Sequence, residues 1–263
     1  MEAALLTAIE DGVLTLTMNR PDRLNALNFE LLQGLLDRLS DAARDRSIGA
    51  VVLAGAGRAF CAGGDVKAMN EGADLAVTYD ERVQGLRSRM EVSRLLHEMP
   101  KPTIAMLRGA VAGAGLSMAL ACDLRVASDT LKMTTAFAKV ALSGDFGGSY
   151  FLTQLVGSAK ARELYLTSPI LNATEAQALG LITRLVADDQ LERETRSLAL
   201  SLAHGPTVTQ GYIKQNMNLA ERASLAEVMD AEALRHVACT RTEDHREAAA
   251  AFVEKRAPKF RGR

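Results

Sequence analysis

The sequence contains no tryptophan, and aromatic residues make up only 4% of its 263 positions. Stacking platforms for bases therefore have little to be built from. The formal net charge is -1 and no long basic stretch occurs, so the charge pattern does not favour nucleic-acid binding. No segment approaches the roughly 18 apolar residues that would cross a bilayer. We therefore expect neither nucleic acid nor a membrane as a partner.

The sequence predicts neither a secretory leader nor a disulfide framework. The N-terminal stretch MEAALLTAIEDG carries Glu2 and Glu10 but has no basic region ahead of an apolar core. Three cysteines, Cys61, Cys122 and Cys239, lie far apart, which is typical of a protein from a reducing compartment. These features predict a cytoplasmic protein.

Metal ligands in a recognisable arrangement are absent from the sequence as well. His236, Cys239 and His245 are spaced unlike the ligands of common zinc sites, and only these three come together. We predict that they lie on the surface or at an interface. The sequence therefore predicts no metal site.

Strands and helices alternate along the first three quarters of the chain. Hydrophobic residues make up 48% of the sequence, enough for a sizeable core. Asn28 is a candidate N-cap for a helix with leucines at helical spacing, and 115–122 is a further helical pattern. Strands are predicted at 12–19, 49–55, 103–107, 123–127 and 181–187. This alternation indicates an α/β fold with right-handed crossovers.

The final part of the sequence has a different pattern. From about Thr207 onward the periodicity is helical, for example over 225–240 and 245–258, and no strand is predicted. We therefore divide the chain into an α/β core, 1–204, and a C-terminal helical region, 205–263.

Three glycine-bearing turns follow predicted strands, at 55–66, at 108–123 and around 144–148. A strand that enters a glycine turn before a helix directs backbone N–H groups into a pocket, where they bind phosphate or stabilise an oxyanion. No P-loop string occurs, and Met118 stands where a dinucleotide fingerprint needs its third small residue. The simpler interpretation is that these glycines only permit tight turns and close packing.

Asp145 is a lone acid in a small and apolar stretch. A carboxylate is costly to desolvate, so it lies in a solvated turn or takes part in chemistry. One interpretation is that Asp145 caps a helix beginning at Gly147 or Gly148. The other is that it acts as a base. A second acid, Asp123, is close enough to Arg125 in sequence for a structural ion pair.

Six segments together resemble the crotonase, or enoyl-CoA hydratase/isomerase, superfamily. They are NRPDRLNALN (19–28), GRAFCAGGDV (57–66), KPTIAMLRGAVAGAGLSMALACDLRVAS (101–128), GDFGG (144–148), NATEAQALGLITRLV (172–186) and AFVEKRAPKF (251–260). The resemblance implies a spiral core of ββα units with a C-terminal helical region, assembled as a homotrimer or a dimer of trimers. It also implies an acyl-CoA thioester as substrate. Coenzyme A would be part of that substrate, and no separate cofactor is expected.

The resemblance also assigns roles to residues. It implies that the backbone N–H groups of Ala62 and Ala114 hold the thioester oxygen as it becomes an enolate, a role that suits small residues and a helix N-terminus. Phe252 and Lys255 match a C-terminal pair that reaches the CoA of a neighbouring subunit. The residues expected to contact CoA are Leu24, Ala26, Ala62, Gly63, Gly64, Asp65, Val66, Phe252 and Lys255.

The sequence departs from the hydratases of the family at two positions. The two glutamates that position water and exchange a proton in hydratases fall at Ser117 and Phe137 here, and neither residue transfers a proton as a carboxylate does. Asp145 matches an acid of the isomerases in the family, and the motifs are closest to those of epoxyphenylacetyl-CoA isomerase-like members. We therefore predict an isomerase in which Asp145 shuttles a proton.

Two alternatives stay open. A hydratase could draw its acid from elsewhere, with Glu71, Asp74 and Glu81 as candidates. A non-catalytic subunit could keep the CoA site as a scaffold, although a scaffold has no need of an oxyanion hole.

Overall fold

The computed structural model describes residues 3–65 and 78–263. Two sheets form its core. The six-stranded sheet has the order β1 (Leu5–Glu10), β2 (Val13–Met18), β3 (Ala50–Gly55), β4 (Thr103–Leu107), β6 (Leu124–Ser128) and β9 (Arg184–Val186). The three-stranded sheet has the order β5 (Ala110–Ala112), β7 (Lys132–Thr134) and β8 (Leu171–Asn172). The five predicted strands correspond to β2, β3, β4, β6 and β9, although β9 is shorter than predicted.

The strand β1 was not predicted from the sequence. It pairs antiparallel with β2 through the two-residue loop Asp11-Gly12, whose φ angles are 52° and 78°. Two consecutive left-handed residues are typical of a tight hairpin turn, and Asp-Gly is a favoured sequence for it. All further pairs of the six-stranded sheet are parallel.

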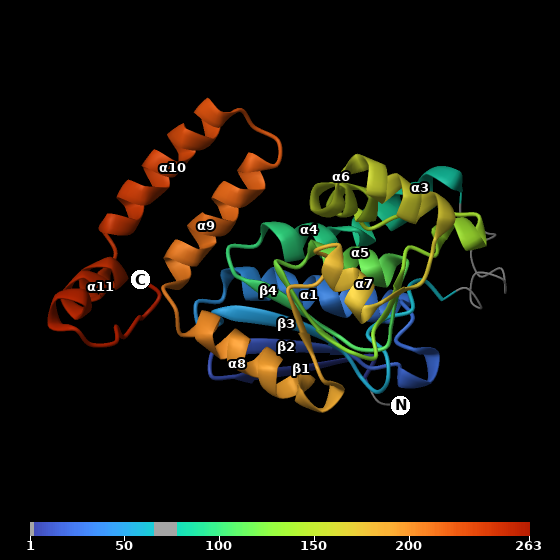
Figure 1. Ribbon diagram of the computed structural model, residues 1–263, viewed down its shortest axis with the longest axis horizontal. Coiled ribbons are helices and arrows are strands. Elements are labelled where there is room, and N and C mark those ends of the chain that lie inside the picture. Colours follow the sequence, from blue (N-terminus) through green and yellow to red (C-terminus); the bar gives the residue numbers. More distant parts are fainter. Residues whose placement is uncertain (1–2, 66–77) are drawn as a thin grey trace.

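Helices cover both faces of the larger sheet. The α-helices are α1 (Phe29–Arg44), α3 (Tyr79–Arg89), α4 (Glu91–Glu98), α5 (Ala114–Ala121), α6 (Gly148–Thr167), α7 (Ala173–Ala178), α8 (Leu191–Ala203), α9 (Thr207–Ala220), α10 (Leu225–Thr240) and α11 (Glu243–Glu254). Short 3₁₀ helices are η1 (Pro21–Arg23), η2 (Phe137–Val140) and η3 (Asp188–Gln190). In Figure 1, α8 lies on one side of the sheet and α1, α4 and α5 lie on the other.

Burial on both faces explains the continuous apolar run of β3. Val52 packs with the α8 residues Leu191 and Leu198, whereas Val51 and Leu53 join the larger cluster on the opposite face. Successive side chains of a strand point to opposite faces, so a strand covered on both sides must be apolar throughout.

The chain builds the core from ββα units. The strands β4 and β5 lie in different sheets and are followed by α5, and β6, β7 and α6 repeat this arrangement. The structure is the crotonase-type α/β fold that the resemblance implied. Gly113 and Gly147 are the N-caps of α5 and α6, so two of the glycine turns lie at the starts of these helices.

The predicted N-cap at Asn28 is confirmed. Its side-chain oxygen accepts a hydrogen bond from the Leu31 N–H at 3.0 Å, and the leucine stripe of α1 is buried in the core. This cap sets the start of α1 directly after the segment 19–28.

A buried lysine connects the C-terminal helices to the core. Lys214 on α9 donates hydrogen bonds to the carbonyls of Leu96 (2.7 Å) and Lys101 (3.1 Å) and to the Asp123 carboxylate (2.8 Å). The predicted pair of Asp123 with Arg125 is therefore wrong. Arg125 instead donates to the carbonyl groups of Cys122 and Leu181.

Beyond α9, the helices α10 and α11 extend away from the sheets (Figure 1). No strand is assigned after Val186 in the described chain, as the sequence pattern predicted. Among the helices of the described residues, none is long and apolar enough to cross a membrane. The boundary at 204/205 falls in the short connection between α8 and α9, and the division into two regions stays a prediction.

We predict that Lys214→Met destabilises the protein by about 3–5 kcal/mol, because it removes the cationic partner of the half-buried Asp123 carboxylate and a buried donor to the Leu96 and Lys101 carbonyls. Urea unfolding followed by circular dichroism measures this loss. The exposed Lys160→Met, which removes only a surface pair with Glu163, is the control and should change stability by less than about 1 kcal/mol. Equal effects of the two substitutions would contradict the role of Lys214.

Candidate active site

The segment 20–27 and the turn 57–65 are held together by a buried asparagine. The Asn25 side chain donates to the carbonyls of Ala56 (2.9 Å) and Ala59 (2.8 Å) and accepts from the Arg20 N–H (2.9 Å). Leu24 and Asn25 both have left-handed backbone angles, with φ of 49° and 56°. These bonds fix an unusual backbone shape that no helix or strand would supply.

Further contacts complete this junction. The Arg20 guanidinium pairs with the Asp65 carboxylate at 3.1 Å, and the Cys61 thiol donates to the Asn25 carbonyl at 3.2 Å. Burial raises the pKa of the Cys61 thiol to about 12, so the thiol stays neutral and serves as packing rather than as a nucleophile.

The structure therefore brings together most of the predicted CoA residues. Leu24 and Ala26 lie against the turn that carries Ala62, Gly63, Gly64 and Asp65, and Leu27 pairs with Gly64 in an isolated parallel bridge. The predicted contact Val66 lies outside the described residues.

The turn 61–64 also lies against the start of α5. The Ala112 N–H donates to the Cys61 carbonyl at 2.9 Å. A Cβ at Gly63 would lie 2.9 Å from the Ala112 carbonyl oxygen, and a Cβ at Gly115 would lie 2.6 Å from the Cys61 carbonyl oxygen. Both distances are too short for a side chain. Glycine at these two positions is therefore what allows the backbones to approach.

The backbone N–H groups at this junction are not equally available. The Ala62 N–H donates to the Leu24 carbonyl at 3.0 Å, so the prediction that it holds a substrate oxygen needs correction. The Gly63 N–H is directed to the Cys61 sulfur at 3.4 Å. Within residues 3–65 and 78–263, we find no acceptor for the N–H of Gly64 or for that of Ala114, the first residue of α5.

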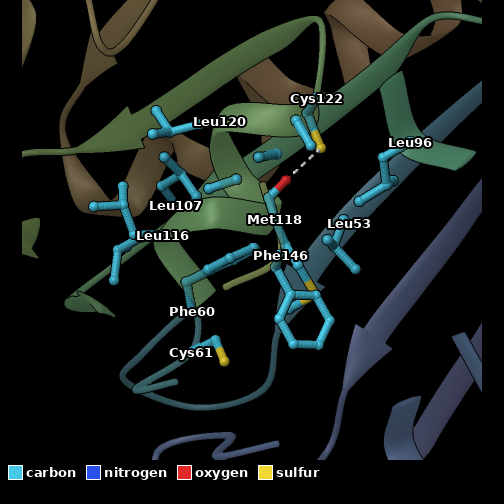
Figure 2. Packing of buried hydrophobic residues seen from close by; sticks show 14 of the residues in the cluster. Leu53, Phe60, Cys61, Leu96, Leu107, Leu116, Met118, Leu120, Cys122 and Phe146 are labelled. Atoms are coloured by element: carbon cyan, nitrogen blue, oxygen red, sulfur yellow. Dashed lines mark hydrogen bonds between the residues drawn. The ribbon is translucent and has the colours of Figure 1, made fainter. Parts of the chain in front are cut away.

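Asp145 lies in a loop with strongly constrained backbone. Gly144, Phe146 and Gly147 have φ values of 110°, 50° and 74°, and Phe146 is 3% exposed. Figure 2 shows Phe146 in the same packed cluster as Phe60, Cys61 and Met118. A buried aromatic ring thus anchors the loop and holds its neighbour Asp145 beside the core.

The capping interpretation of Asp145 is wrong. Gly147 is the N-cap of α6 and no side chain caps this helix. The Asp145 main-chain carbonyl accepts from the Gly148 N–H at 3.1 Å, whereas the side-chain Oδ1 atom is buried and has no hydrogen-bond partner in the described structure.

Burial of this carboxyl changes its acidity. Desolvation raises the pKa of Asp145 from its ordinary value of 3.8 to about 6. The carboxyl is then mainly charged at neutral pH, yet it binds a proton far more readily than an exposed aspartate. These are the properties of a general base that later returns its proton.

The two positions that carry glutamates in hydratases are both buried here. The Ser117 hydroxyl donates to the Gly113 carbonyl at 3.3 Å. Phe137 stacks on Tyr165, with ring centroids 5.9 Å apart and ring planes 8° from parallel. Tyr165 was not identified from the sequence. It stands on α6, some twenty residues beyond Asp145, and only the fold brings the two together.

Of the three other acids considered for hydration, Glu81 lies within the described residues. Glu81 forms a capping box with Thr78 at the start of α3, and those hydrogen bonds lower its pKa. Glu71 and Asp74 lie outside the described residues.

The C-terminal candidates lie elsewhere on the chain. Phe252 is exposed on α11, Lys255 is the C-cap of that helix, and in Figure 1 this helix is far from α5. In the described part of the chain, no three His, Cys, Asp or Glu side chains form a group that could hold a metal ion.

Comparison with known proteins places these features in context. The model of the enoyl-CoA hydratase/isomerase family matches residues 8–263. The chain is 37% identical to 1,2-epoxyphenylacetyl-CoA isomerase of Escherichia coli (strain K12), over 98% of each chain. It is 33% identical to a probable enoyl-CoA hydratase of Mycobacterium bovis, over 97% of each chain. The crystal structure of an enoyl-CoA hydratase from Polaromonas sp. JS666 superposes with a TM-score of 0.92 at 30% identity, covering 98% of this chain and 99% of that one.

We predict that Asp145→Asn raises the melting temperature at pH 7.5. A carboxyl whose pKa is raised in the folded state stabilises least above that pKa, and the stability penalty disappears as pH falls from about 6 toward 3.8. Because the carboxyl is partly solvated, we expect a gain of about 1 kcal/mol, or roughly 2–4 °C. The gain should shrink at pH 4.5.

Differential scanning calorimetry at the two pH values measures this effect, with the exposed Asp129→Asn as control. A lower melting temperature of Asp145→Asn at pH 7.5 would contradict the prediction that the desolvation of the charged carboxyl outweighs its contacts in the folded protein.

Proposed function

The chain belongs to the enoyl-CoA hydratase/isomerase family, a family of acyl-CoA enzymes. We propose that it catalyses a double-bond isomerisation or a related isomerisation of an acyl-CoA thioester. Asp145 is the proton shuttle in this proposal. The observation that carries it is the buried Oδ1 atom of Asp145, which has no hydrogen-bond donor in the described structure and belongs to a carboxyl with a pKa of about 6.

The proposed reaction needs one carboxylate. Asp145 removes a proton from the carbon α or γ to the thioester carbonyl, and the electron pair of that C–H bond moves into the acyl chain as an enolate. Asp145 then returns the same proton to another carbon, so that no atom is gained or lost. A base with a pKa close to the working pH suits both halves of this exchange.

Two backbone donors stabilise the enolate oxygen in this proposal. They are the N–H groups of Ala114 and Gly64, since the Ala62 N–H is occupied by the Leu24 carbonyl. The Ala114 N–H begins α5, so the helix dipole adds to its effect on a negative oxygen. Leu24, Ala26, Gly63, Gly64 and Asp65 would contact the CoA part of the substrate.

Hydration is the second candidate, supported by the hydratases among the similar proteins. It would require a second proton-transfer group, and Ser117 and Phe137 supply no carboxylate. A scaffold without activity would keep the CoA contacts but would have no use for the N–H groups of Gly64 and Ala114, which have no acceptor within the described part of the chain.

A second copy of the chain is the proposed partner. The C-terminal helices expose large apolar side chains that a monomer would leave in water, and the family resemblance implies a trimer or a dimer of trimers. These side chains include Leu225, Met229, Leu234, Val237, Phe252 and Val253. In such an assembly Phe252 and Lys255 would reach the CoA bound to a neighbouring subunit. A cytoplasmic location stays a prediction from the sequence.

We predict that a 3-enoyl-CoA gains conjugated 2-enoyl absorbance with the enzyme while crotonyl-CoA does not lose it. Asp145→Asn should reduce this turnover by about 10²–10⁴-fold, because it removes the proposed proton shuttle, while the Asp65 carboxylate of the turn 57–65 is paired with Arg20. 1,2-Epoxyphenylacetyl-CoA should be assayed in parallel, since a similar protein bears the name of an isomerase for it.

Loss of absorbance from crotonyl-CoA would indicate hydration. Full turnover by Asp145→Asn would contradict the proposed role of Asp145. Thermal stabilisation by CoA without turnover of any of the thioesters would favour the scaffold.

We predict that Ala114→Pro lowers kcat by about 10²–10³-fold, because proline removes one oxyanion donor. Proline is tolerated at the first position of a helix, so α5 should still form. The matched control is Ala173→Pro, since Ala173 is the buried first residue of α7. Kinetics and thermal stabilisation by CoA should be measured for both variants. Equal turnover of the two would argue against an oxyanion role for the Ala114 N–H.

A further inference from the structure

The hydroxyl groups of Tyr165 and Ser117 lie side by side next to the loop that carries Asp145. A Cβ built on Gly148 would lie 2.3 Å from the Ser117 Oγ atom and 2.5 Å from the Tyr165 hydroxyl oxygen. The Ser117 hydroxyl donates to the Gly113 carbonyl at 3.3 Å and lies close enough to the Tyr165 oxygen to lower the pKa of the phenol. Two polar groups thus meet at the first residue of α6.

The loop 144–148 also packs against the Tyr165 ring. A Cβ built on Gly144 would lie 2.9 Å from the Tyr165 Cε1 atom. Gly144 precedes Asp145 directly, and Gly148 donates its N–H to the Asp145 main-chain carbonyl. Any larger residue at 144 or 148 would collide with Tyr165 or Ser117. The glycines of this loop therefore make room for the tyrosine as well as shaping the turn.

The donors and acceptors of Ser117, Tyr165 and Asp145 are not all used by the hydrogen bonds of the described structure. Ser117 has one hydroxyl hydrogen, which can go to the Gly113 carbonyl or to the Tyr165 oxygen. A tyrosine that accepts from serine still has its own O–H to donate. Among residues 3–65 and 78–263, the buried Asp145 Oδ1 acceptor has no donor. The Tyr165 O–H is thus a donor that packs against the loop 144–148, and the Asp145 Oδ1 atom is an acceptor carried by the same loop.

Burial is the cause of the raised Asp145 pKa, and Tyr165 is a titratable group whose own pKa responds to the Asp145 carboxylate. Arg87, Arg94, His97 and Glu98 line the hollow beside Phe146 and Gly147, the two residues that follow Asp145. The helix α6 contributes Tyr165, while α5 and η2, which pack against α6, contribute the uncharged Ser117 and Phe137. The pKa of Tyr165 is raised to about 12, first by burial and then by the Asp145 carboxylate, so the phenol keeps its proton at neutral pH. It can act only as a hydrogen-bond donor or acceptor and not as a second base.

We propose that Tyr165, held by Ser117, is the positioning residue of Asp145: its O–H donates to the Asp145 carboxylate whenever that carboxylate is charged. This inference rests on the proposed function, because it assigns a partner to the proposed base. No proton leaves the phenol. The hydrogen bond orients the carboxylate before it takes a proton from the substrate, and it lowers the energy of the charged form that begins each cycle.

The stacked Phe137 ring supports this arrangement. It covers the face of Tyr165 and lies beside the start of α5, since a Cβ at Gly113 would lie 3.7 Å from the Phe137 Cε1 atom. Phe137 therefore does more than fill the position of a hydratase acid. The Phe137 ring holds Tyr165 in place by stacking on it. In this proposal the Tyr165 hydroxyl is the polar group near the reacting carbons, where a hydratase would have the glutamate.

The test is Tyr165→Phe, which removes the hydroxyl and keeps the stacked ring. We expect kcat to fall about tenfold or more with KM changed less than about twofold, because the substrate contacts are kept. Losing a donor to the charged form raises a carboxyl pKa, so the acidic limb of the kcat/KM profile should move upward by about 0.5–1 pH. The Asp145 pKa, measured by NMR with carbon-13-labelled aspartate and assigned through Asp145→Asn, should rise in the same direction.

Two further variants complete the experiment. Ser117→Ala should shift the same limb in the same direction but less, and its effect should not add to that of Tyr165→Phe. Tyr150→Phe is the matched control. It also removes one hydroxyl from α6, but that hydroxyl donates to Glu221 at 2.7 Å, so the pH profile and the Asp145 pKa should not change.

The outcomes separate the two proposals. An unchanged Asp145 pKa and pH profile in Tyr165→Phe, with Asp145→Asn inactive, would overturn the role of Tyr165 and leave the proposed function standing. If the wild-type protein turned over none of the thioesters, the proposed function would fail, and the NMR titration alone would decide whether Tyr165 donates to Asp145. If Tyr165→Phe did not fold, Ser117→Ala would provide the same two readouts.

Discussion

The rest of the site depends on the close approach of two backbones, the turn 61–64 and the start of α5. Gly63 and Gly115 permit this approach because neither has a Cβ. A Cβ at Gly63 would overlap the Ala112 carbonyl oxygen, and a Cβ at Gly115 would overlap the Cys61 carbonyl oxygen. The approach places the Ala114 N–H beside the glycine turn. It also commits the Ala62 N–H to Leu24, which links the segment 20–27 to the same junction.

The loop that carries Asp145 lowers the stability of the folded protein but raises the pKa of the carboxyl. Its backbone uses left-handed angles at Phe146 as well as at two glycines, and it buries a carboxyl oxygen without a donor. Such strain persists only where the surroundings over-determine it. Here the buried Phe146 ring and the stacked Phe137 and Tyr165 rings supply that support. The result is a carboxyl with a pKa close to the pH at which it would work.

The similar proteins bear names of isomerases and of hydratases, and all share the fold. The chemistry must therefore be decided by a few side chains at a common backbone framework. In this chain the two positions expected to carry glutamates hold a serine and a phenylalanine, and a tyrosine from α6 stands between them. We interpret these differences as the replacement of two catalytic carboxylates by one, Asp145, which the hydroxyl groups of Tyr165 and Ser117 position.

The sequence by itself determined the α/β class, the main parallel strands and the Asn28 cap, because apolar periodicity and capping residues are local signals. The resemblance of six segments indicated the family. The sequence also singled out Asp145. It missed β1, although Asp11-Gly12 is a recognisable hairpin turn, and it paired Asp123 with Arg125 instead of the distant Lys214. Only the tertiary structure decided which N–H groups are free at 62–64 and which side chain stands next to Asp145. Those answers depend on contacts between segments far apart in the chain, such as Leu24 with Ala62 and Ser117 with Tyr165, and no local pattern encodes them.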